Sequence, residues 1–77
     1  MTSRRRRFNA ASRWKGVHFD REKNAYRAYI TVERKRRHLG YWTVEIAAAV
    51  AVDAATRAIY GKDGRYNFPG PGELSAL

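Results

Sequence analysis

The chain has 77 residues, which is enough for one small domain and too few for a large core or a deep substrate cleft. Sixteen Lys and Arg residues against seven Asp and Glu residues give a formal net charge of +9, and this excess favours a polyanionic partner, most often nucleic acid. There is no cysteine, so disulfides and thiolate metal sites are excluded.

Residues 1–12 are predicted to form a flexible basic arm. Ser3 is followed by four arginines, and like charges so close together repel one another. The arm is expected to follow a nucleic-acid backbone or to enter a minor groove; a nuclear import signal or a purely solubilising role are the alternatives. No apolar stretch follows it, so we expect no signal peptide.

No apolar run in the chain approaches the roughly 20 residues that span a membrane. We therefore expect no membrane partner. The expected location is the cytoplasm or nucleoid of a bacterial or phage host, or the nucleus of a eukaryotic cell.

The first half of the chain is predicted to form three short antiparallel strands. Aromatic and β-branched residues alternate with polar ones, and clusters of Asp, Asn, Lys and Arg separate the runs. The expected strands are 13–19, 25–33 and 37–42, with turns at 20–24 and 34–36.

The second strand has the clearest alternation, because successive side chains of a strand point to opposite faces of a sheet. One face would carry Tyr26, Ala28, Ile30 and Val32. The other would carry Arg27, Tyr29, Thr31 and Glu33.

A helix is predicted from Thr43, as N-cap, to Gly61, which is a natural stop. The side chains expected to face the sheet are Ala47, Ala48, Ala51, Val52, Ala55, Ala58 and Ile59. Those expected on the other side are Glu45, Asp53, Thr56 and Arg57. Ile46 and Val50 fall outside the buried arc and are expected to be partly exposed.

The fold class that follows is α+β, with a three-stranded antiparallel sheet packed against one C-terminal α-helix. After the helix, Tyr66 and Phe68 are expected to fold back on the core. The domain would span residues 13–69, and residues 70–77 would form a flexible tail because turn signals dominate there.

Catalytic chemistry finds little support in the sequence. The only histidines, His18 and His38, have no metal-ligand spacing, and the carboxylates are scattered. The glycines form no phosphate-binding loop. We expect no enzymatic activity, no metal, no cofactor and no small-molecule substrate.

If the helix covers one face of the sheet, the other face is open and cationic. Arg contacts guanine in the major groove, and sheet-type readers place such a surface there. The candidates for base edges are Lys15, His18, Arg27, Tyr29, Thr31, Arg36 and His38. The candidates for phosphates are Arg4, Arg5, Arg6, Arg7, Arg13, Arg21, Lys23, Arg34, Lys35 and Arg37.

Over about residues 12–69 the chain resembles the Apetala-two/ethylene-response-factor (ERF) DNA-binding domain family. The segments that carry the resemblance are "WKGV" (14–17), "YRAYI" (26–30), "RRHLGYW" (36–42), "YNFP" (66–69) and, along the helix and just after it, Ala47, Ala48, Asp53, Ala55 and Gly61. The resemblance implies a three-stranded sheet lying in the DNA major groove, without metal or cofactor. The family's contact positions fall on Lys15, His18, Tyr29, Thr31, Arg36 and His38.

The segment "HLGYW" is more similar to bacterial and phage members, which often accompany HNH homing endonucleases, than to plant members. The HNH nuclease itself is absent, so the resemblance implies no cutting activity. We expect a module that binds double-stranded DNA with a sequence preference, monomeric on DNA, as a transcription regulator or targeting module. The alternatives are an RNA-binding module, a domain that binds acidic proteins, and a non-catalytic accessory domain of an HNH-type homing endonuclease or an integrase.

Overall fold

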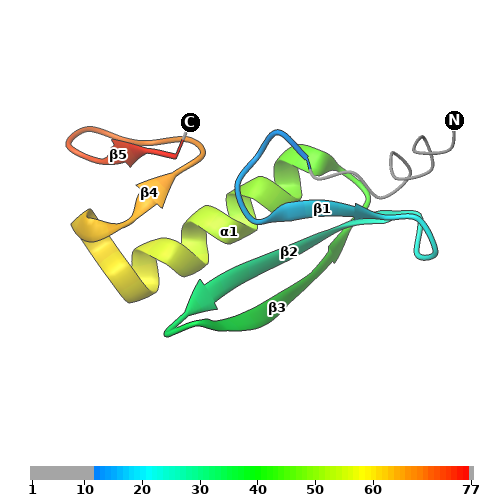
Figure 1. Cartoon of the computed structure of the whole chain (residues 1–77). Helices are drawn as coiled ribbons and strands as arrows, with labels where there is room; N and C mark the ends of the chain where they lie inside the picture. The colour runs from blue at the N-terminus through cyan, green and yellow to red at the C-terminus, as the bar shows by residue number, and fades with distance from the viewer. Residues whose placement is uncertain (1–11, 77) are drawn as a thin grey trace, which may run out of the picture.

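In the computed structural model, which describes residues 12–76, three strands precede one long helix (Figure 1). The strands are β1 (Val17–Asp20), β2 (Ala25–Val32) and β3 (Lys35–Trp42), in the sheet order β1-β2-β3. Both strand pairs are antiparallel. The helix α1 (Glu45–Tyr60) follows the sheet, so the predicted α+β fold class is confirmed.

The chain after α1 forms a short 3-10 turn, η2 (Gly61–Asp63), and two very short strands, β4 (Arg65–Tyr66) and β5 (Leu74–Ser75). These two strands pair in parallel. The predicted arginine arm, Arg4–Arg7, lies outside the described residues. None of the helices formed within residues 12–76 has the length and apolar character needed to span a bilayer.

Two turns set the register of the sheet. In the turn at 21–24, the Asp20 carboxylate accepts the backbone N–H groups of Glu22 at 3.0 Å and Lys23 at 3.2 Å. Between β2 and β3, Glu33 (φ 52°) and Arg34 (φ 70°) form a two-residue turn whose left-handed backbone matches the twist of the strands. The prediction that Glu33 ends a strand and that residues 34–36 form the turn is therefore wrong, and β3 begins at Lys35.

The first strand begins at Val17, not at residue 13 as predicted. The residues before it form a tight turn, in which the Val17 N–H donates to the Trp14 carbonyl at 3.3 Å and Gly16 has φ +80°. A Cβ on Gly16 would lie 2.6 Å from the Tyr29 carbonyl oxygen and 2.8 Å from Val52 Cγ1. The absence of that side chain lets the turn, β2 and α1 approach one another closely.

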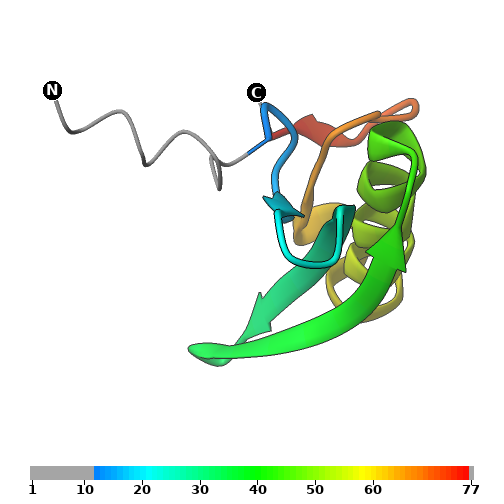
Figure 2. The same cartoon turned by 90° about the vertical axis from the view of Figure 1, so that its right-hand side faces the viewer.

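The core between α1 and the sheet is built from small side chains, and Figure 2 shows the helix lying along one side of the curved sheet. The fully buried cluster is Val17, Ala28, Ala48, Ala49 and Val52. Larger side chains, partly buried, close its margins: Trp14, Tyr26, Leu39 and Trp42. Because the centre is mostly alanine, the helix axis lies close to the strands.

The buried side of α1 differs from the prediction. Ala58 and Ile59 are exposed, whereas Asp53 (2% exposed) and Thr56 (3% exposed), predicted to face outward, are buried. The C-terminal segment covers this side of the helix, and the Asp53 carboxylate accepts the backbone N–H groups of Asn67 at 2.9 Å and Phe68 at 2.8 Å. The Thr56 hydroxyl donates to the Val52 carbonyl at 2.8 Å. Hydrogen bonding thus satisfies two polar groups inside the fold.

The ends of α1 agree with the prediction in part. The N-cap is Val44, whose side chain makes no capping bond, so the assignment of Thr43 is wrong. At the other end Gly61 (φ 54°) stops the helix as predicted, and its N–H donates to the Arg57 carbonyl. Ile46 and Val50 are exposed, as expected.

The segment after Pro69, expected to be a flexible tail, is held against α1 by one ion pair. The Arg57 guanidinium donates to both carboxylate oxygens of Glu73, at 2.7 and 2.8 Å, and the Gly70 N–H donates to Glu73 at 2.7 Å. The Arg57 hydrogen bonds, followed by the Gly70 backbone N–H, lower the pKa of Glu73 to about 2. Tyr66, 0% exposed, packs under the Arg57 guanidinium at 4.5 Å, and burial raises its pKa. The predicted return of Tyr66 to the core is confirmed, whereas Phe68, predicted to return with it, is 37% exposed and contacts the Trp14 ring at 4.6 Å.

Replacing Asp53 by alanine is expected to destabilise the fold strongly. The backbone N–H groups of Asn67 and Phe68 would lose their acceptor inside the protein, which lowers the free energy of unfolding by on the order of 3 kcal/mol. Urea unfolding followed by tryptophan fluorescence measures the change. The matched control is Asp63→Ala at an exposed position, where a change within about 0.5 kcal/mol is expected. Equal effects of the two substitutions would contradict this role of Asp53.

The Glu73 pair predicts a specific loss of stability in acid. Since the folded pKa of about 2 lies below the ordinary value of 4.5, ionised Glu73 stabilises the fold above pH 4.5, and this contribution disappears as the pH falls toward 2. Glu73→Gln should be less stable than the wild type at pH 7, and the two should converge near pH 2. Urea unfolding of both proteins at several pH values tests this. A gap that stays constant across the range would exclude the ion pair as its source.

Candidate functional site

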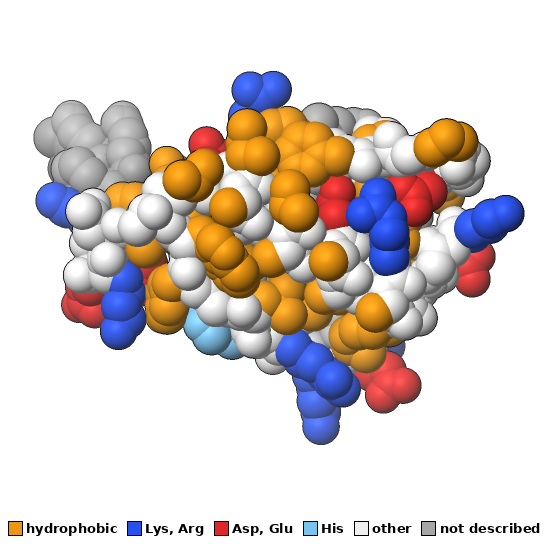
Figure 3. All heavy atoms as spheres, turned by 180° about the vertical axis from the view of Figure 1, so that it is seen from behind, with side chains coloured by type: hydrophobic (Ala, Val, Ile, Leu, Met, Phe, Trp, Pro, Cys, Tyr) orange, Lys and Arg blue, Asp and Glu red, His pale blue; other side chains and the backbone are white. Residues whose placement is uncertain are grey.

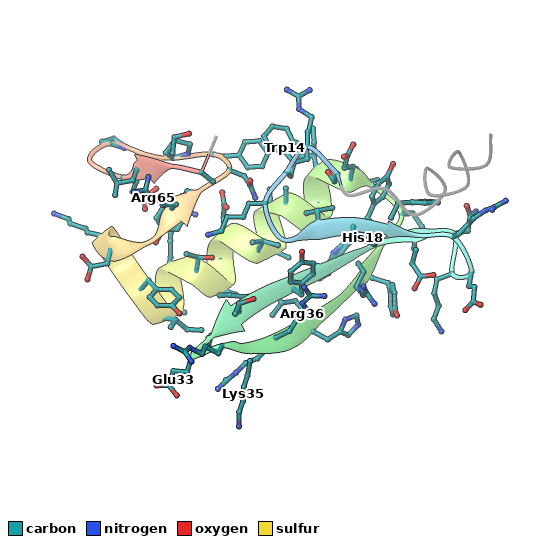
Figure 4. The ribbon with its side chains drawn as sticks, viewed as in Figure 1. Trp14, His18, Glu33, Lys35, Arg36 and Arg65 are labelled. Carbon is teal, nitrogen blue, oxygen red and sulfur yellow. The ribbon has the colours of Figure 1, made fainter. Side chains whose placement is uncertain are left out.

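The side of the sheet turned away from α1 carries a continuous set of polar and aromatic side chains. The cross-strand register places His18 opposite Arg27, Tyr29 opposite His38, and Thr31 opposite Arg36. Tyr41, opposite Arg27 on β3, completes the set. We call these seven side chains the open sheet face: His18, Arg27, Tyr29, Thr31, Arg36, His38 and Tyr41. In Figure 4, His18 and Arg36 lie over the sheet, while Glu33 and Lys35 lie at its tip.

Tyr41 was missed by the sequence analysis because β3 contains a bulge. The register with β2 shifts between Ala28 and Tyr29, where Leu39 is the extra residue, so Leu39 turns inward and Tyr41 joins the outward side. Gly40, with φ +127°, is the sequence signal for this irregularity, since a glycine inside a strand often marks a bulge.

Side chains of the open sheet face stack on one another. The Arg36 guanidinium carbon lies 4.2 Å from the centre of the Tyr29 ring. The rings of His38 and Tyr41 meet edge to face at 4.8 Å, and the Lys23 ammonium lies 5.5 Å from the Tyr41 ring. These contacts restrict the orientation of two cations and three rings before any ligand arrives.

The open sheet face is cationic. Arg27 and Arg36 carry its permanent charges. Two carboxylates lie at its margins: Asp20, the last residue of β1, lines a hollow together with His18 and Arg27, and Glu33 is exposed in the turn before β3. Within the described residues, the buried Nε of Arg27 has no hydrogen-bond partner. A buried donor without a partner is unfavourable by about 1–3 kcal/mol.

Lys15, predicted as a base-edge residue, is not in a strand, and buried polar groups fix its backbone instead. Its N–H donates to Asn67 Oδ1 at 2.8 Å, and the Asn67 amide donates to the Lys15 carbonyl at 3.1 Å. Asn67 is 4% exposed and is held in turn by Asp53. The sequence signals for this arrangement are Asp53, an aspartate inside an apolar helix, and Asn67, the asparagine of "YNFP". The sequence alone did not predict that these two residues position Lys15.

A groove of about 550 Å³ lies between the end of β2 and the C-terminal half of α1. Its lining includes four of the seven predicted base-edge residues. We call it the edge groove, and the polar residues that line it are Lys15, Tyr29, Thr31, Arg36, Thr56, Tyr60, Asp63 and Arg65. Arg65 and Tyr60 were not foreseen, because both come from the chain near the end of α1, which sequence alternation does not connect with the sheet.

The predicted phosphate-binding residues are placed unevenly. Arg21 and Lys23 lie in the turn between β1 and β2, and Arg34 lies in the turn between β2 and β3, so these three border the open sheet face. Lys35 and Arg37 pair with Val32 and Ile30, which places them on the opposite side of the sheet by register. The structure does not bring these two together with the open sheet face. Arg13 stacks on Trp14 at 4.9 Å, outside the sheet.

The reverse side of the molecule has a different character. Seen from behind, hydrophobic side chains gather across the middle of the surface, over α1 (Figure 3). The exposed large apolar side chains of α1 and its N-cap include Val44, Ile46 and Val50. The cationic and aromatic surface and the apolar surface thus lie on opposite sides of the domain.

Comparison of the sequence with protein-family models gives no match, and comparison with curated proteins gives none. The resemblance to the ERF family therefore stays a prediction. Among residues 12–76, no three His, Asp or Glu side chains are grouped to hold a metal ion.

Proposed function

We propose that this domain binds double-stranded DNA by placing the open sheet face in the major groove. The observation that supports this most directly is the cross-strand register, which aligns two arginines, two histidines and two tyrosines on the side of the sheet that α1 leaves uncovered. We propose a non-enzymatic role without cofactor, as a transcription regulator or a DNA-targeting module, with the chain monomeric on DNA. The resemblance to the ERF family is part of this proposal.

The dimensions of the face suit the groove. Three strands about 4.8 Å apart give a surface roughly 10 Å across, and the major groove of B-DNA is about 12 Å wide. Arg36 is the second residue of the edge strand β3, next to the turn at Glu33 and Arg34, and its guanidinium can meet the O6 and N7 acceptors of guanine with two hydrogen bonds. Its stacking on Tyr29 reduces the freedom that binding would otherwise remove.

Neighbouring side chains would read and position the duplex. The Thr31 methyl group and the Tyr41 ring suit the methyl group of thymine and the sugars, while His18, Arg27 and His38 can hydrogen-bond base edges. Lys23, held near Tyr41, and Arg21 and Arg34 at the two ends of β2 would neutralise phosphates.

Duplex binding is expected to depend steeply on salt. Each phosphate neutralised contributes about −0.9 to the slope of log K against log salt concentration, because counterions are released. Titration of a labelled duplex at several salt concentrations measures this slope. A structured RNA of equal length serves as competitor: a flat salt response, or a preference for the RNA, would count against the proposal.

Three alanine substitutions separate the roles of the cations. Arg36→Ala should weaken binding by about 1–3 kcal/mol and flatten the sequence preference, whereas Lys23→Ala should weaken all sequences alike and reduce the salt slope by about 1. Arg37→Ala, the adjacent arginine directed to the opposite side by register, is the matched control and should change sequence preference little. Selection of bound duplexes from a random pool, done with each variant, gives both affinity and preference. Identical profiles for Arg36→Ala and Arg37→Ala would refute the assigned orientation.

A further inference from the structure

The far half of β2 has an edge without a neighbouring strand. Among residues 12–76, β1 pairs with β2 only over Ala25–Ala28, and the remaining residues, Tyr29–Val32, pair with β3 alone. These residues extend over about 13 Å at 3.3 Å per residue. Figure 1 shows the end of β2 running past β1 toward the side of η2 and β4.

The backbone groups of Thr31 point to this free edge. The two residues that flank a two-residue hairpin turn form backbone hydrogen bonds with each other, and here they are Val32 and Lys35. Along an antiparallel strand, successive residues direct their N–H and C=O groups alternately toward one neighbour and the other. Thr31, the residue before Val32, therefore directs its N–H and C=O away from β3. Two contacts agree with this direction: the Tyr29 N–H donates to the Gly16 carbonyl at 2.9 Å, and the Tyr60 hydroxyl donates to the Thr31 carbonyl at 3.3 Å. A carbonyl oxygen can accept two hydrogen bonds, so the Thr31 carbonyl can accept a second one beside that from Tyr60. Thr31 therefore offers its N–H as a donor and its carbonyl as an acceptor.

This edge forms one wall of the edge groove, and α1 forms the other. Val52, Thr56 and Tyr60 line the helical wall, and Ile30 contributes an apolar contact from the strand. A groove between a strand edge and a helix, about 550 Å³ in volume, matches the shape of a short extended peptide.

The charge around the groove favours an acidic occupant. Three cations line it, Lys15, Arg36 and Arg65, against a single carboxylate among the lining residues, Asp63. The whole chain also carries a net charge of +9. Acidic side chains on an extended segment would meet these cations while its backbone pairs with Thr31.

We propose that the edge groove binds an extended acidic peptide segment of a partner protein, which adds a strand beside Tyr29–Val32. A nucleic acid would satisfy the cations, but its phosphates only accept hydrogen bonds, whereas a peptide backbone supplies an acceptor for the Thr31 N–H and a second donor for its carbonyl. The inference goes beyond DNA binding and does not depend on it. Because Tyr29, Thr31 and Arg36 belong to both surfaces, a bound peptide and a bound duplex should weaken each other.

The test uses the full ¹⁵N-labelled chain and a blocked peptide of about eight residues in which glutamate alternates with valine. On titration, the Thr31 amide resonance should shift and its hydrogen exchange should slow. A peptide with lysine in place of glutamate should bind at least about tenfold more weakly, as should the same acidic peptide N-methylated throughout, which lacks all backbone donors.

Matched protein variants locate the site. Arg65→Glu should weaken binding at least about tenfold, while Lys23→Glu, the same type of charge reversal in the turn before β2, should leave it within about twofold. If Arg65→Glu unfolds, Asp63→Asn is the second variant and should tighten binding.

Three results would overturn the proposal. They are the lack of saturable binding up to about 1 mM peptide, equal binding of the N-methylated peptide, and protection of the Thr31 amide by a duplex but not by the acidic peptide. The last result would assign the groove to nucleic acid.

Discussion

The arrangement of this domain depends on the buried carboxylate of Asp53. Its two oxygens accept the backbone N–H groups of Asn67 and Phe68, and the Asn67 side chain in turn bonds both the N–H and the carbonyl of Lys15. Three parts of the chain, distant in sequence, thereby meet at one point: the loop before β1, the middle of α1 and the segment after η2. A core built mainly of alanine and valine has limited apolar area, so a satisfied polar network contributes specificity that packing alone would not supply.

The same network holds the helix and the C-terminal segment on one side of the sheet and leaves the opposite side uncovered by them. The helix and the C-terminal segment both pack on the same side, so none of the described residues covers the other face of β1, β2 and β3 (Figure 2). The pairing of β2 with its neighbours then determines which side chains appear there. Since a register shift of one residue would exchange the two faces of a strand, the left-handed turn at Glu33 and Arg34 and the bulge at Leu39 decide the composition of the open sheet face.

Much of the fold followed from local patterns, and the errors have a common cause. The alternation in β2 correctly placed Ala28 and Ile30 inside, and the long alanine-rich run correctly indicated a helix ending at Gly61. Hydrophobic periodicity failed at Asp53 and Thr56, because polar residues become buried only when a distant segment supplies hydrogen bonds. It also failed at Tyr41, where a bulge changes the period of the strand. The turn at Glu33 and Arg34 gave no warning, since neither residue favours a left-handed backbone.

The open sheet face and the edge groove share the side chains of Tyr29, Thr31 and Arg36, so ligands on the two surfaces would compete for them. Arg36 stacks on Tyr29 at the boundary between the open sheet face and the edge groove, so its guanidinium has access to either ligand but not to both in full. A partner peptide that engages Arg36 would remove the cation proposed to read a base, while Lys23 and Arg21, in the turn before β2, would still attract phosphates. Occupation of the groove would thus reduce sequence preference more than it reduces overall attraction to DNA. If both proposals hold, the recognition of a protein and the recognition of a duplex would be coupled without any change in fold.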